Sequence, residues 1–192
     1  SEGIVFHIDT PGGRVDSAVD IKDAILATKI PTTAYVDRNA ISAGSLISLA
    51  CDRIYMSTGA SIGAATAVDL EGKKASEKVI SYFRAQMRAA AEANGRRADI
   101  AEAMVDEEIA IEGVTVKGKL LTLTYTEALE LGISDGTADT LDDVLVRLGK
   151  SGAAIERMKP NWAENLVRFL THPIVSSLLM SLGFLGLLIE LK

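Results

Sequence analysis

The chain has 192 residues, enough for one domain with an appendage, and 48% of them are hydrophobic, so a substantial core can form. The net charge of −6 argues against a nucleic-acid binder, and the low aromatic share of 5% is typical of tightly packed α/β proteins rather than β-sandwiches. The single cysteine, Cys51, excludes an internal disulfide and ends an apolar segment, which indicates a small core residue.

The first part of the chain predicts alternating strands and helices. Residues 3–9 alternate and contain β-branched and aromatic side chains, which predicts a strand, and the Pro-Gly-Gly sequence at 11–13 then forces a turn. The further elements expected are a helix over 14–29, a strand over 32–36, a helix over 41–50 and a strand over 53–56. This order with short connections predicts a parallel sheet with helical crossovers.

The second part begins with an irregular, glycine-containing stretch over residues 57–75. Ser76 then precedes a long amphipathic helix that Asn94 and Gly95 end. The elements expected after the irregular stretch are helices over 77–94 and 100–106, a strand over 119–124, and helices over 126–132 and 141–148. Residues 1–148 therefore predict one α/β domain.

Residues 149–171 form the predicted linker to a membrane region at 172–192. Residues 173–189 carry no charged side chain, and this length is near the lower limit for a helix that crosses a bilayer. His172 precedes the run, Pro173 opens it and Glu190 follows it, as expected at the edges of a first membrane span. A buried core helix is the alternative interpretation.

The Gly12-Gly13 turn is the first candidate for chemistry. Glycines after a buried strand allow backbone N–H groups to point at a ligand oxygen, as an oxyanion hole requires. An ordinary strand-to-helix turn explains the same pair. The third glycine of a dinucleotide-binding fingerprint is missing, so no cofactor is expected.

Ser42 and Lys78 are candidates for a nucleophile and its base. Ser42 opens a helix, whose N-terminus favours developing negative charge, and Ala43 and Gly44 beside it are small enough for a substrate to approach. Serine is also a favoured N-cap, which is the plain alternative. Lys78 lies in the first turn of a predicted helix, and a lysine acts as a base only in its neutral form. A surface lysine is the alternative there.

The two histidines give little support to a Ser-His-Asp triad. His7 lies within the first predicted strand and His172 at the edge of the membrane segment. Neither is placed on a loop that would bring it to Ser42, although sequence distance does not exclude His7. No cluster of histidine, cysteine or carboxylate side chains has metal-ligand spacing, so no metal is expected.

Four motifs in order resemble the ClpP-class membrane serine proteases, and most of all the NfeD family. They are residues 8–13 (Ile-Asp-Thr-Pro-Gly-Gly), 42–45 (Ser-Ala-Gly-Ser), 61–64 (Ser-Ile-Gly-Ala) and 126–133 (Thr-Glu-Ala-Leu-Glu-Leu-Gly-Ile). The resemblance covers about residues 3–145 and the start of the membrane region. It implies a ClpP/crotonase-like α/β fold and a C-terminal transmembrane helix.

The resemblance also implies a serine endopeptidase with Ser42 as nucleophile, Lys78 as base, and an oxyanion hole from the amides of Gly12 or Gly13 and of Ala43. The histidine that ClpP places near residues 61–66 is missing here, which favours a Ser/Lys dyad and leaves an inactive member open. The implied substrates are hydrophobic segments of stomatin-like membrane proteins. The expected protein is a homo-oligomer, a dimer or larger, in the cell membrane, multi-pass at full length. A crotonase-type acyl-CoA enzyme and an inactive membrane scaffold are the alternatives.

Overall fold

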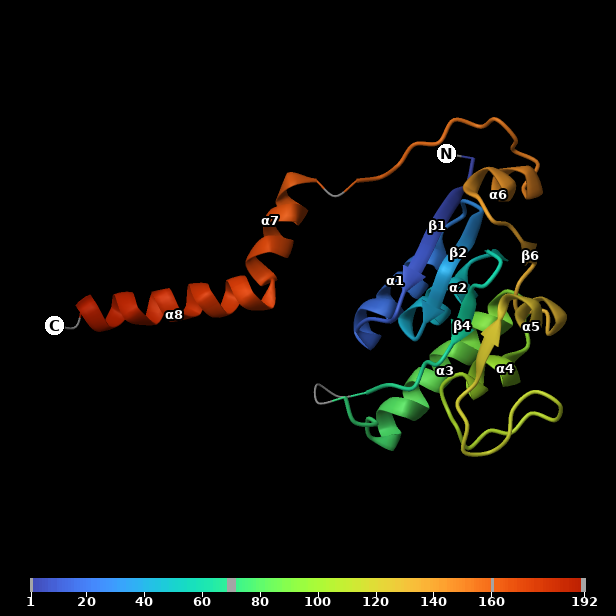
Figure 1. Ribbon diagram of the computed structural model, residues 1–192, viewed down its shortest axis with the longest axis horizontal. Coiled ribbons are helices and arrows are strands. Elements are labelled where there is room, and N and C mark those ends of the chain that lie inside the picture. The colour runs from blue at the N-terminus through green and yellow to red at the C-terminus, as the bar shows by residue number, and fades with distance from the viewer. Residues whose placement is uncertain (1, 69–71, 160, 191–192) are drawn as a thin grey trace. The chain divides into compact units, whose positions relative to one another are not determined.

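The computed structural model describes residues 2–68, 72–159 and 161–190 (Figure 1). The chain divides into two compact units, Ser1–Gly152 and Ala153–Lys192. The first holds a sheet with its covering helices, and the second holds two helices. Each unit is described by itself.

The first unit is built on a six-stranded sheet around β2. Its strands are β1 (Ile4–Thr10), β2 (Thr32–Ile41), β3 (Arg53–Met56), β4 (Ser61–Gly63), β5 (Thr122–Thr124) and β6 (Gly136–Thr137). The order is β5-β4-β2-β3-β6, and β1 also pairs with β2. All pairs are parallel except β4 with β5. The predicted parallel sheet with helical crossovers is confirmed, with one antiparallel strand added at its edge.

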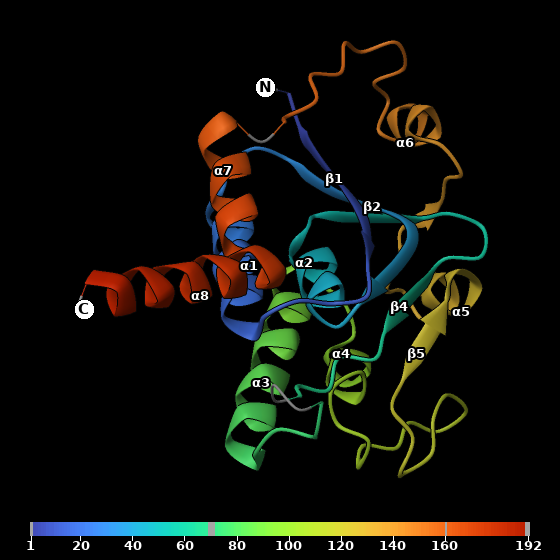
Figure 2. The same ribbon diagram turned by 60° about the vertical axis from the view of Figure 1, so that its left-hand side comes forward.

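Six helices accompany the sheet. They are α1 (Val15–Ala27), α2 (Ala43–Ala50), α3 (Glu77–Ala93), α4 (Ala98–Ala103), α5 (Tyr125–Glu130) and α6 (Leu141–Arg147). Helices α1, α2 and α3 contact one another, and α2 also contacts β1, β2 and β4. In Figures 1 and 2, α5 and α6 lie on the opposite side of the unit from α1. Helix α2 is thus enclosed between the sheet and two other helices.

Small side chains allow α2 to pack closely in the core. Every residue of α2 except Ile47 is buried, and Leu46 and Leu49 are fully so. A Cβ added at Gly44 would lie 2.7 Å from Cγ2 of Thr10, so the contact between α2 and β1 requires glycine there. Gly44 therefore serves the packing of α2 against β1. Cys51 at the end of α2 is fully buried, which confirms its prediction as a core residue.

Strands β2, β4 and β5 differ in extent or position from the sequence-based expectation, and β6 was not expected. Strand β2 continues to Ile41, which had been expected to begin a helix, so α2 starts only at Ala43. Strand β4 lies within the stretch expected to be irregular, and the strand expected over 119–124 is confined to Thr122–Thr124. Both differences arise because β4 and β5 pair with each other over three residues, a length too short for an alternating pattern.

The second unit contains α7 (Trp162–Thr171) and α8 (Pro173–Glu190). Helix α7 falls within the predicted linker, and α8 coincides with the predicted membrane segment. Within the described residues, no helix alone meets the length and hydropathy requirements for crossing a membrane. Helix α7 and the part of α8 from Pro173 to Leu187 meet them jointly, with a bend of 70° between them.

Candidate active site

Ser42 occupies a strained junction between β2 and α2. Its φ is 55° and its ψ is −114°, and Ser42 and Ala64 are the non-glycine residues with positive φ in the described part of the chain. Such a conformation costs on the order of 1–3 kcal/mol in a non-glycine residue. Ser42 holds the N-cap position, but its side chain makes no capping hydrogen bond. The plain N-cap interpretation therefore does not account for this serine.

Gly63 and Ser45 hold the strained junction in place. The Ser42 N–H donates to the carbonyl oxygen of Gly63 at 2.9 Å. The hydroxyl of Ser45, fully buried one turn into α2, donates to the same carbonyl at 3.0 Å and to that of Ala40 at 2.7 Å, and it accepts from the Gly63 N–H at 3.0 Å. Ser45 thus joins α2 to β2 and β4 beside Ser42.

The glycine turn after β1 lies directly against Ser42 and Ala43. A Cβ added at Gly12 would lie 3.1 Å from Cβ and 3.5 Å from Oγ of Ser42, and a Cβ added at Gly13 would lie 3.6 Å from Cβ of Ala43. The φ of Gly12 is 138°, which strongly favours glycine. The structure therefore brings together the predicted residues Gly12, Gly13, Ser42 and Ala43.

The amides around Ser42 differ in their availability. The Gly12 N–H donates to Oγ1 of Thr10 at 3.2 Å, and that hydroxyl donates back to the Gly12 carbonyl at 3.0 Å. Within the described residues, the N–H groups of Gly13 and Ala43 have no acceptor. An oxyanion hole requires backbone amides that are free to donate beside the nucleophile, and these two amides meet that requirement.

Lys78 lies apart from this group. It is exposed in the first turn of α3, and among the residues described here none forms a hydrogen bond or ion pair with it. In Figures 1 and 2 the first turn of α3 lies well below α2. The structure does not bring Lys78 into contact with Ser42. Lys74 in the preceding segment pairs with Glu107 at 2.8 Å.

The histidines are engaged elsewhere. His7 on β1 stacks on Tyr35 with ring centroids 5.2 Å apart, and its Nε2 lies 3.2 Å from a carboxylate oxygen of Asp37. His172 lies in the second unit, between α7 and α8. The described residues contain no cluster of metal-ligating side chains.

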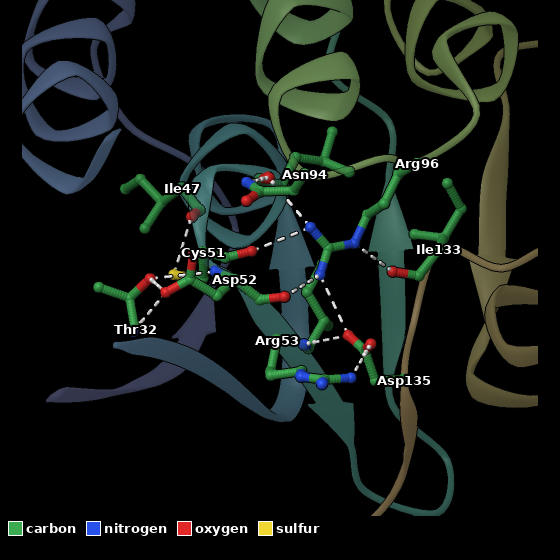
Figure 3. Close-up of polar contacts among 11 residues, drawn as sticks. Thr32, Ile47, Cys51, Asp52, Arg53, Asn94, Arg96, Ile133 and Asp135 are labelled. Atoms are coloured by element: carbon green, nitrogen blue, oxygen red, sulfur yellow. Dashed lines mark hydrogen bonds and ion pairs between the residues drawn. The ribbon is translucent and has the colours of Figure 1, made fainter. Parts of the chain in front are cut away.

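A buried arginine supports the other end of α2 (Figure 3). The Arg96 side chain is 5% exposed, and its guanidinium lies among carbonyl groups at the end of α2 and near β6. It donates to the carbonyl oxygens of Leu49, Cys51, Asp52 and Ile133 and to the carboxylate of Asp135. Sequence reasoning missed Arg96, because its position after the Asn94-Gly95 helix end does not indicate where the side chain folds.

Comparisons with known proteins match most of the chain. The family described as NfeD1b, N-terminal domain, matches residues 1–158. Membrane protein NfeD1b of Bacillus subtilis is 43% identical over 192 residues, covering 100% of this chain and 44% of the relative. Membrane-bound protease PH1510 of Pyrococcus horikoshii is 30% identical over 213 residues, covering 98% of this chain and 46% of the relative. The chain spans less than half the length of these two relatives.

Solved structures show the same architecture. A variant of the 1510-N membrane-bound stomatin-specific protease, with lysine replaced by alanine and a substrate peptide bound, has a TM-score of 0.71 at 27% identity. That comparison covers 89% of this chain and 84% of the other. ClpP1 from Listeria monocytogenes has a TM-score of 0.53 at 21% identity over 74% of this chain and 77% of the other, a likeness of fold alone. The chain therefore belongs to the NfeD1b N-terminal domain family and has a ClpP-like α/β fold, as its motifs predicted.

Proposed function

We propose that this chain is the protease domain of a membrane-attached serine endopeptidase, with Ser42 as nucleophile and Lys78 as general base. The observation that carries the proposal is the strained Ser42 with an uncommitted hydroxyl beside the free amides of Gly13 and Ala43. A nucleophilic serine on a sharp strand-to-helix turn is a recurring arrangement in hydrolases. An N-cap serine would not need this backbone strain.

The support for Lys78 comes from the relatives. Solved forms of the 1510-N protease include a serine-to-alanine variant and a lysine-to-alanine variant with a substrate peptide bound. The family resemblance assigns the base to Lys78, whose side chain is exposed and forms no ion pair among the described residues. The proposal requires the first turn of α3 to approach Ser42 in the working enzyme.

In the proposed reaction, the neutral amine of Lys78 takes the proton of the Ser42 hydroxyl while Oγ attacks the carbonyl carbon of the peptide bond. The amides of Gly13 and Ala43 donate to the resulting oxyanion. Lys78 returns the proton to the leaving amine, and a water molecule then hydrolyses the acyl-enzyme. Gly12 provides space beside Ser42, since its own amide already donates to Thr10.

Stomatin-like membrane proteins are the proposed substrates, cut within hydrophobic segments. The 1510-N protease is described as specific for a stomatin homolog, and both long relatives are named membrane proteins. Membrane attachment through α7 and α8 fits those names and the bent helix pair. The transmembrane helix over 172–192, the multi-pass topology at full length and the homo-oligomer stay predictions.

Cleavage of a stomatin-derived apolar peptide tests this proposal. The full chain should cleave the peptide, faster as the pH rises because the base must be neutral. Ser42→Ala and Lys78→Ala should each lower the rate by a factor of at least about 1,000, because the two groups act as a unit. Lys74→Ala is the matched lysine control and should retain nearly full activity. Full activity in Lys78→Ala together with loss of activity in His7→Ala would contradict the proposal and indicate His7 as the general base.

A further inference from the structure

Helix α7 separates apolar and polar side chains onto two faces. At 3.6 residues per turn, one continuous face carries its aromatic and leucine side chains. These residues are Trp162, Leu166, Phe169 and Leu170. Glu164 and Arg168 lie on the opposite face. The helix is therefore amphipathic along its whole length.

The apolar face of α7 is uncovered. Every residue of α7 is exposed, including Trp162 at 79% and Phe169 at 61%. Exposed apolar patches of this kind mark interaction sites, because an uncovered Trp and Phe lose the free energy that burial would provide. The face needs an apolar partner.

The chain leads directly from α7 into the apolar helix α8. Helix α8 starts at Pro173 after a bend of 70°, and it carries no charged side chain before Glu190. If α8 runs along the normal of a bilayer, the axis of α7 then lies within about 20° of the membrane plane. The bend would thus place α7 at the surface of the bilayer that α8 enters.

We propose that α7 is an interfacial helix lying in the headgroup region of a lipid bilayer. Its apolar face contacts the acyl chains, while Glu164 and Arg168 face water. Tryptophan favours this region, because its ring is amphipathic. The bilayer is favoured over a protein partner because the same chain continues into a segment suited to lipid. This proposal rests on the proposed membrane attachment through α8.

Trp162 makes the proposal directly measurable, because it is the only tryptophan of the chain. The full chain is reconstituted into phosphatidylcholine vesicles carrying bromine either near the glycerol end or near the methyl end of the acyl chains. We expect the emission of Trp162 to shift to shorter wavelength and to be quenched more by the shallow bromines. Stronger quenching by the deep bromines would make α7 part of the span and overturn the proposal. Absence of quenching would also overturn it, since α7 would then lie in water or against protein.

A matched pair of variants tests which face enters the lipid. Phe169→Glu places a charge on the apolar face and should abolish the shift and the quenching. Arg168→Glu places the same charge on the polar face and should leave both unchanged. Equal effects of the two variants would contradict the proposed orientation.

Flotation of the vesicles separates this proposal from those it rests on. Protein that floats without quenching of Trp162 overturns the interfacial helix while leaving attachment through α8 intact. Protein that does not float overturns both. Peptide cleavage by Ser42 is measured independently, so neither result depends on the proposed protease activity.

Discussion

Gly63 and Ser45 stabilise the strained backbone conformation of Ser42. The Gly63 carbonyl accepts from both the Ser42 N–H and the Ser45 hydroxyl, and Gly63 itself has a φ of 137°. A Cβ added at Gly63 would lie 2.5 Å from the carbonyl oxygen of Leu121. A larger residue at position 63 would therefore shift the backbone and with it the Gly63 carbonyl that holds Ser42. The position of the proposed nucleophile therefore depends on Gly63 and Ser45.

Replacement of Ser45 should lower the kcat of peptide cleavage by more than the accompanying loss of protein stability explains. Ser45→Ala leaves the buried Gly63 amide unpaired, which should cost about 1–3 kcal/mol in the free energy of unfolding. Ser48→Ala is the control, because that buried hydroxyl donates only to the Gly44 carbonyl within α2. Denaturation gives both stabilities, and peptide cleavage below the unfolding range gives kcat and KM. We expect kcat to fall in Ser45→Ala and to be retained in Ser48→Ala; equal kcat values would contradict the role of Ser45.

Cys51 should make the protein less stable in alkaline solution. Burial raises the pKa of its thiol to about 12. The unfolded thiol loses its proton near pH 8.5, so stability is fully present below that pH and is lost as the pH rises towards 12. Between pH 7.5 and 9.5 the free energy of unfolding should fall about 1.4 kcal/mol more in the natural chain than in Cys51→Ala. Chemical denaturation at both pH values measures the free energy of unfolding of the two proteins. An equal decrease in the natural chain and in Cys51→Ala would contradict the raised pKa of the buried thiol.

At the scale of elements, α2 is fixed at both ends. Ser45 and Gly63 hold its N-terminal end, and Arg96 and the Asn94 side chain donate to carbonyl groups at its C-terminal end. Asp135 also pairs with Arg53, so the end of α2 is joined to β3 and to the segment entering β6. A helix of eight residues is too short to be stable alone, and these contacts compensate.

Loss of Arg96 should therefore destabilise the fold strongly. Arg96→Met removes the side-chain donor of several buried carbonyl groups, while Asp135 keeps its contacts with Arg53 and the Ile54 N–H. At about 1–3 kcal/mol for each unsatisfied carbonyl, the loss should be about 3–5 kcal/mol. Arg88→Met is the matched control, because Arg88 forms a half-exposed pair with Glu102 and should cost at most about 1 kcal/mol. Denaturant midpoints of the full chain in mild detergent give both values. Similar decreases in the free energy of unfolding in the two variants would show that the buried Arg96 contributes no more to stability than the half-exposed Arg88.

The predictable elements are those with long periodic patterns. Helices α1 and α3, strand β1 and the part of β2 over 32–36 follow from hydrophobic spacing, and Gly95 marks the end of α3. Strands β4 and β6 are too short to show any alternation, so the sequence does not indicate them.

The residues of the candidate site also differ in how far the sequence predicts them. The turn at Gly12 and Gly13 and the junction at Ser42 were predicted from local motifs, and the structure brings them together. The roles of Ser45 and Arg96 depend on partners far along the chain, such as Gly63 and Ile133, which spacing does not reveal. Lys78 was predicted from the resemblance to the family, and its approach to Ser42 stays a prediction.

At the scale of the molecule, the two units suggest separate roles in catalysis and in membrane attachment. The unit Ser1–Gly152 contains the proposed nucleophile and its amides, and the unit Ala153–Lys192 contains the amphipathic α7 and the apolar α8. A protease attached beside a bilayer would meet membrane-proximal segments first, which fits the proposed preference for hydrophobic substrates. A peptide library should therefore show apolar residues around the cut, and selection for lysine or arginine there would contradict this preference.

The most direct test of the account is covalent labelling of the full chain with a fluorophosphonate, since only an activated serine reacts readily. Peptide mapping should place the adduct on Ser42. Labelling should disappear in Ser42→Ala, fall steeply in Lys78→Ala and persist in His7→Ala. An adduct-free Ser42, or labelling that is unchanged in Lys78→Ala, would contradict the proposed Ser/Lys dyad.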